Sequence, residues 1–209
     1  MIDLPIVLFT LTSLVIIVTP GQDLVLVMTR SIAQGSKAGM MTASGVSFGL
    51  LGHTVLAALG LGALIQASYH LFFVLKIVGA LYLVYLGWKT FVSKPVQLDS
   101  MNLDHKNTQK CFVQGALSNL VNPKIAIFYF AYLPQFVPQS SSNAFLDLLI
   151  LGSWFAFLTF LIKVPVGYIA GKLSNWFRAN PDVQIWLNRT SGTVLIGLGI
   201  KLAFDERPQ

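Results

Sequence analysis

Charged residues are scarce in this chain of 209 residues. Lys and Arg number 14 and Asp and Glu number 8, which together make 11% of the sequence, whereas a soluble domain usually carries about 25%. Hydrophobic residues make up 55%. This composition excludes an ordinary soluble domain and predicts an all-α integral membrane protein.

The sequence also lacks residues that several function classes need. Its one cysteine, Cys111, allows no intramolecular disulfide and no paired-cysteine redox chemistry. It contains no G-x-x-x-x-G-K-[ST] phosphate loop and no His, Cys and carboxylate cluster with zinc-site spacing. The net charge of +6 is spread over short connectors and not gathered on one face. We therefore expect no enzymatic activity, no cofactor, no bound metal and no nucleic-acid partner.

Six apolar segments are long enough to cross a bilayer, which takes about 20 residues per helix. The longest polar connector, about 93–111, divides this single membrane domain (1–209) into repeats of about 4–92 and about 112–204. The segments cover about 4–28, 39–65, 70–92, 112–137, 144–171 and 187–204.

Positive charge marks the orientation of these segments. Lys and Arg collect in the first, third and fifth connectors, whereas the other connectors and both ends hold only Lys201 and Arg207. Because cytoplasmic connectors are enriched in Lys and Arg, we expect the odd-numbered connectors to be cytoplasmic and both termini to be periplasmic.

The first and fourth segments each carry a helix breaker near the middle, Thr19-Pro20-Gly21 and Asn122-Pro123-Lys124. Proline removes a backbone N–H and leaves carbonyl groups unpaired before it. One such proline is typical of a simple kink, but a matched pair in the two halves indicates a duplication. Because each half has three spans, the second half crosses in the opposite sense. This predicts an inverted-topology repeat, in which broken helices meet at a binding site.

Two charged residues lie beside the breaks. Asp23 falls in the first turn after Pro20, and Lys124 directly follows Pro123. An ionisable group within a span is costly and usually faces a partner or a cavity. Lys124 opposes the local helix dipole, so an anion should compensate it, either Asp23 or the carboxylate of a small substrate. A zwitterionic amino acid suits such a site.

Other polar residues within the spans are weaker candidates. His53 is either a neutral histidine bonded to a neighbouring helix or a residue of a proton relay or of substrate contact. Lys163 either extends toward the cytoplasmic boundary, the reading we favour, or faces the cavity. Asn119 and Asn122 either satisfy freed backbone groups or contact substrate. The predicted substrate and proton pathway comprises Pro20, Gly21, Gln22, Asp23, His53, Asn119, Asn122, Pro123, Lys124 and Lys163.

The two proline motifs resemble those of the LysE/RhtB amino acid exporters. Thr19-Pro20-Gly21-Gln22-Asp23 is similar to the T-P-G-P-D signature of their first span, with Gln22 in place of the second proline, and Asn119-x-x-Asn122-Pro123-Lys124 looks like their fourth span. The resemblance covers about 10–204. It implies a bacterial inner-membrane protein that exports amino acids or derivatives such as homoserine, threonine, leucine or lysine by proton antiport. The few charges near the breaks slightly favour a neutral substrate.

Other function classes share parts of this build. Aquaporin-type channels need two Asn-Pro-Ala motifs, and a lysine at the constriction disfavours water conduction. An ion or metal exporter would line its path with more acidic residues than Asp23. An intramembrane hydrolase would need a nucleophile beside His53. Gly45-x-x-x-Gly49 and Gly167-x-x-x-Gly171 predict close helix packing and leave a homodimer open.

Overall fold

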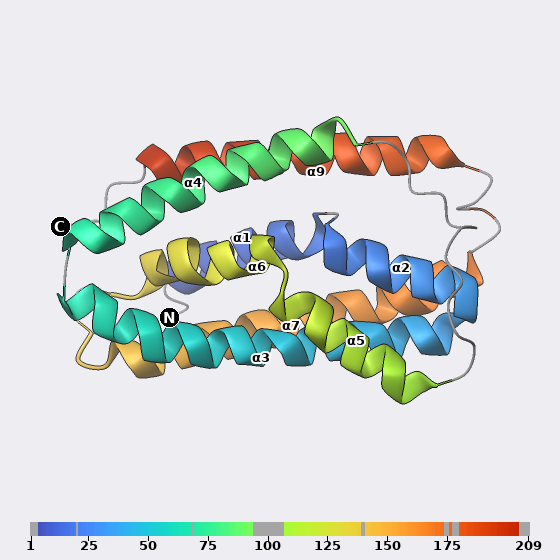
Figure 1. The fold of residues 1–209 in the computed structure, drawn as a ribbon, viewed down its shortest axis with the longest axis horizontal. Coiled ribbons are helices and arrows are strands. Elements are labelled where there is room, and N and C mark those ends of the chain that lie inside the picture. Colours follow the sequence, from blue (N-terminus) through green and yellow to red (C-terminus); the bar gives the residue numbers. More distant parts are fainter. Residues whose placement is uncertain are drawn as a thin grey trace.

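Figure 1 shows the computed structural model, an elongated bundle of helices. It describes residues 4–19, 21–67, 69–93, 107–138, 141–173, 176 and 180–204. Every secondary-structure element within these ranges is a helix, which confirms the predicted all-α fold. The elements are α1 (Leu4–Val18), α2 (Gln22–Gln34), α3 (Ser36–Ala67), α4 (Tyr69–Phe91), α5 (Thr108–Leu120), α6 (Pro123–Ile127), the π-helix η1 (Phe128–Tyr132), the 3₁₀ helix η2 (Leu133–Phe136), α7 (Ala144–Lys172) and α9 (Pro181–Phe204).

The helices occupy the six predicted apolar segments, but several extend further. α2 continues to Gln34 and α3 begins at Ser36, so only Gly35 separates them. Its φ of 92° is open to glycine without strain, and its N–H bonds to the carbonyl of Ser31 at 2.9 Å. The polar end of α2 stays helical because its side chains find partners, as in the 3.1 Å hydrogen bond from Arg30 to Gln34.

Length and hydropathy identify some of these helices as membrane spans. Among the described residues, α3 over Ser36–Gly60 and α7 are long and apolar enough to cross a bilayer. α1 and α2, bent by 51° at their break, add a third candidate if they count as one span. These findings agree with a membrane protein, and the six-span inverted repeat stays a prediction.

The bundle contains a group of helices around α3 and a separate pair, α4 and α9. α3 contacts α7 and α5 along much of its length, and α4 runs beside α9 (Figure 1). Glycines allow both approaches: an added Cβ would lie 2.7 Å from the Gly192 carbonyl oxygen at Gly87 and 2.7 Å from the Ala116 carbonyl oxygen at Gly49. The close packing predicted for Gly49 is therefore confirmed, and Gly87 shows the same kind of contact between α4 and α9.

Candidate functional site

Two interrupted helices meet at the centre of the bundle. In the first half, α1 ends at Val18 and α2 begins at Gln22, while Pro20 lies outside the described residues. In the second half, α5 ends at Leu120 and α6 begins at Pro123. Proline suits the first position of a helix because its missing N–H would have no helical partner there. Both predicted breaks are therefore present.

Asn122 stabilises the restart of the second helix. Its side-chain oxygen accepts a hydrogen bond from the backbone N–H of Lys124 at 3.0 Å, which makes it the N-cap of α6. Of the two roles left open for Asn122, the structure shows the satisfaction of a freed backbone group. The residue also lines a small cavity between the breaks, called the inner cavity below.

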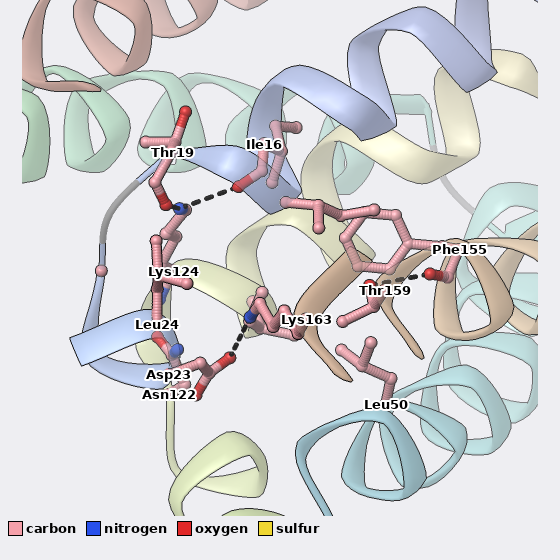
Figure 2. A pocket seen from close by; sticks show the side chains of 13 residues that line it. Ile16, Thr19, Asp23, Leu24, Leu50, Asn122, Lys124, Phe155, Thr159 and Lys163 are labelled. Carbon is pink, nitrogen blue, oxygen red and sulfur yellow. Dashed lines mark hydrogen bonds and ion pairs between the residues drawn. The ribbon is translucent and has the colours of Figure 1, made fainter. Parts of the chain in front are cut away.

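Lys124 crosses from the second break to the first. Its Nζ donates hydrogen bonds to the carbonyl oxygens of Ile16 and Thr19, each at 3.1 Å (Figure 2). Pro20 has no N–H for the Ile16 carbonyl, and the end of α1 frees that of Thr19. The anionic partner expected for Lys124 is therefore replaced by two carbonyl dipoles. Of the two anions left open for Lys124, Asp23 forms its ion pair elsewhere, and a substrate carboxylate stays a prediction.

Asp23 instead pairs with Lys163 of α7. The Nζ of Lys163 lies 3.5 Å from Oδ2 of Asp23, with side-chain exposures of 6% and 3%. The same oxygen accepts a 2.8 Å hydrogen bond from Nδ2 of Asn119. In Figure 2 the two charged side chains point toward one another across the cavity. The favoured interpretation, that Lys163 extends to the cytoplasmic boundary, is wrong, because a buried carboxylate holds the ammonium in the interior.

Asn119 links this pair to His53. Nε2 of His53 lies 3.1 Å from the backbone oxygen of Asn119. A carbonyl oxygen can only accept, so Nε2 is the donor in this contact. The ring also stacks on Tyr129, with centroids 5.5 Å apart. His53 thus matches the bonded-histidine interpretation and reaches the site through Asn119.

Two cavities bordered by described residues lie next to the breaks. The inner cavity measures about 10 Å³, which is room for about one water molecule. It is bordered by Gly21, Asp23, Asn122, Lys124 and Lys163, with apolar walls from Ile16, Ile17, Leu24, Leu50, Ile125 and Phe155. A second pocket of about 260 Å³, here called the outer chamber, shares Gly21, Asn122 and Lys124 with it and also contains Gln22 and Pro123.

Sequence reasoning missed Thr159 at the inner cavity and Tyr129 beside His53. Thr159 of α7 lines the cavity, with its hydroxyl bonded to the Phe155 carbonyl at 2.8 Å. Its position four residues before Lys163 places both on one helix face, which was a usable signal. Tyr129 lies beneath His53 and donates a 3.1 Å hydrogen bond to the Gly152 carbonyl, a contact that no local pattern predicts.

Comparison with known proteins identifies the family. A profile of LysE type translocators matches residues 14–206, which is nearly the whole chain. The chain belongs to this family. The resemblance inferred from the two proline motifs is thereby confirmed. Among solved structures, none gives a significant match.

Relatives of this LysE type translocator include proteins named for amino acid efflux. It is 36% identical to the uncharacterized membrane protein YrhP of Bacillus subtilis, over 88% of this chain and 91% of that protein. It is 29% identical to the homoserine/homoserine lactone efflux protein of Salmonella typhimurium, over 93% and 94% of the two chains. It is 27% identical to the leucine efflux protein of an Enterobacter species, over 90% of each.

Proposed function

We propose that this LysE type translocator is a secondary transporter that exports amino acids across the bacterial inner membrane in exchange for protons. The observation that carries the proposal is the buried Asp23–Lys163 pair beside the broken first helix. Ionisable groups at such positions mark substrate or proton pathways. Membership of a translocator family and relatives named for efflux support the same reading.

The charges of the pair match those of a zwitterion. An amino acid carries one ammonium and one carboxylate, so its ammonium can replace that of Lys163 at Asp23 while its carboxylate takes the released lysine. Leaving either buried charge without a partner would cost about 3–5 kcal/mol. Exchange of like charge for like avoids that cost, which favours a zwitterion over an amine or an acid alone.

The inner cavity must widen to admit such a substrate. At about 10 Å³ it has room for about one water molecule. At the break between α1 and α2 and at the break between α5 and α6, the two helices on either side can move as separate segments. We infer that opening at these breaks gives alternating access, as in other carriers with broken helices.

Protons are the proposed coupling ions, with Asp23 as their binding group. One oxygen of Asp23, Oδ1, has no hydrogen-bond partner among the described residues, although it is buried. That oxygen is available to a proton or to a substrate ammonium. Because both would bind the same carboxylate, their binding is mutually exclusive, which is the requirement for exchange.

The apolar walls of the inner cavity favour a neutral aliphatic substrate. Leu24, Leu50 and Phe155 border it together with Ile16 and Ile125. Relatives named for homoserine and leucine efflux agree with this class. We therefore propose leucine-like or homoserine-like amino acids as the cargo.

The proposed topology has six spans in two inverted repeats and both termini in the periplasm. α1 begins and α9 ends toward the same end of the bundle (Figure 1), as an even number of spans requires. Reporter fusions at each terminus test this directly. A cytoplasmic signal at either end would contradict the topology.

Transport by inverted membrane vesicles tests the proposed function. We expect labelled leucine or homoserine to accumulate when the vesicle interior is acid and not when the gradient is collapsed. Asp23→Asn and Lys124→Ala should abolish accumulation while inserting normally. Asp147→Asn is the matched control, because this carboxylate lies in the first turn of α7, away from the cavity.

Two outcomes would contradict the proposal. Normal transport by inserted Asp23→Asn and Lys124→Ala proteins would remove both residues from the pathway. Amino acid flux that does not depend on the proton gradient would instead indicate a channel.

A further inference from the structure

The outer chamber is large enough to hold a small solute while the inner cavity is closed. It measures about 260 Å³, against about 10 Å³ for the inner cavity. The two compartments share Gly21, Asn122 and Lys124, so they follow one another across the breaks. A solute that reaches the inner cavity from this side must first occupy the outer chamber.

The chamber lies toward the end of the molecule that carries the predicted cytoplasmic connectors. Leu86, Lys89, Thr90 and Ser93 line it from the last turns of α4 and the residues after it, and Asn188 and Leu195 line it from α9. Nearer the middle of α4, Gly79 lies against Ala131 of η1 and Ile127 of α6. The chamber therefore lies between the two breaks and the part of the α4–α9 pair that contains the end of α4 and the first half of α9.

The charge of the chamber has one sign. Among the described residues that line it, two are lysines, Lys89 and Lys124, and none is acidic. Nζ of Lys124 is held by the carbonyls of Ile16 and Thr19, whereas Lys89 is exposed. Cavities lined by one sign of charge concentrate ligands of the opposite sign. The first carboxylate beyond the chamber is Asp23, in the inner cavity.

The remaining lining residues fit an amphiphilic solute. Val25, Leu86 and Leu195 form an apolar wall. Gln22, Asn122 and Asn188 provide amides, and Nε2 of Gln22 donates to the hydroxyl of Ser118 at 3.3 Å. One apolar and one polar wall match an aliphatic amino acid better than an inorganic anion.

We propose that the outer chamber is the first binding site of the substrate, and that it selects a free carboxylate with Lys89 as the counter-charge. The inference rests on the proposed export function. The carboxylate binds at Lys89, the aliphatic side chain packs against Leu86 and Leu195, and the ammonium faces inward toward Asp23. Amino acids are therefore captured by their carboxylate before the inner cavity opens.

A purely structural role for Lys89 predicts different behaviour. A cation in the last turn of α4 also interacts with the helix dipole and marks the membrane boundary. Removing a charge with only that role changes insertion or stability equally for every ligand. A carboxylate-binding role changes affinity only for ligands that carry a carboxylate.

Cysteine labelling distinguishes these roles without depending on transport. Asn188→Cys in a Cys111→Ser background places one thiol in the chamber, since Cys111 is the single native cysteine. We expect an impermeant maleimide to label it in inverted vesicles and leucine or homoserine to slow the labelling. Leucinamide, which lacks the carboxylate, should not protect. Lys37→Cys, exposed at the start of α3 and outside the chamber, should be labelled at the same rate with and without amino acid.

The charge itself is tested by Lys89→Gln in the labelling background. The leucine concentration needed for half-protection should rise about fivefold, the upper range for an exposed ion pair, and Lys37→Gln should leave it unchanged. Equal loss of protection in both variants would assign Lys89 a structural role. If none of leucine, homoserine, threonine and lysine slowed the labelling, the outer chamber would not be a substrate-binding site, even if the protein transported these amino acids. Protection by an amino acid without gradient-driven uptake would support binding in the outer chamber and contradict the proposed export function.

Discussion

Replacing Lys163 by Met tests whether the central ion pair holds the folded core together. The substitution keeps most of the apolar stem of the side chain and removes the ammonium that lies 3.5 Å from Asp23. Oδ2 of Asp23 would keep only its hydrogen bond from Asn119, and Oδ1 has no partner among the described residues. A carboxylate that is 3% exposed would then stand uncompensated in the protein interior.

The expected loss is large because both partners are buried. Removing one member of a buried pair costs about 3–5 kcal/mol of the free energy of unfolding, which corresponds to a fall of about 10 °C in the melting temperature of a chain this size. The protein carries its own reporter for the assay. Its single thiol, on Cys111, is buried, so a thiol-reactive dye in detergent solution reports unfolding.

A double variant separates loss of charge balance from loss of packing. Asp23→Asn with Lys163→Met removes both charges, and an amide at residue 23 still accepts the hydrogen bond from Asn119. We expect it to recover most of the stability lost in Lys163→Met, while transport stays absent. Lys172→Met, at the exposed end of the same helix, should change the free energy of unfolding by less than about 1 kcal/mol. Equal melting temperatures for the single and double variants would refute the charge-balance reasoning.

Two further substitutions test how the backbone around the site positions its charges. Gly49→Ala places a Cβ 2.7 Å from the Ala116 carbonyl oxygen and 3.1 Å from Oδ1 of Asn119, so we expect it to displace the amide that bonds Asp23. The transport rate should fall more than tenfold, about the effect of one lost charged hydrogen bond. Gly60→Ala in the same helix meets no atom within 4 Å and should transport normally, and equal rates in the two variants would exclude this role for Gly49. Asn122→Ala removes the N-cap of α6 and should lower the melting temperature through a loss of about 1 kcal/mol. Asn122→Ser keeps a neutral capping oxygen and should retain most of the stability. An unchanged melting temperature in Asn122→Ala would show that the cap is not needed.

The breaks could be predicted from sequence because proline acts locally. Pro123 lacks an N–H in any context, so it restarts a helix wherever it follows a capping residue such as Asn122. The irregular continuation of the fourth segment escaped prediction, although Pro134 removes the donor for the Phe130 carbonyl. The chain there forms a π-helix and a 3₁₀ helix over Phe128–Phe136 and not the continuous helix expected.

The choice of partners for Asp23 and Lys124 escaped prediction for a different reason. Both charges were located correctly beside the breaks, but pairing depends on which neighbouring helix presents an opposite charge at the same depth. Lys163 lies 140 residues from Asp23 along the chain, and no local pattern relates them. Unpaired carbonyls before each proline were predicted, but no local pattern indicates that Lys124 of the other break binds those of Ile16 and Thr19.

If the proposed export function holds, the contacts across the breaks should make opening of the inner cavity depend on substrate. Lys124 of the second half holds carbonyls freed in the first half, and Asn119 and Lys163 of the second half hold Asp23 of the first. If the halves separate with the site empty, these charged groups lose partners at low dielectric, at a cost of several kcal/mol. An amino acid supplies a replacement for each lost charge contact as they separate. Under the proposed export function, the balanced pair would therefore keep the empty protein closed and favour a zwitterion as the ligand that opens it.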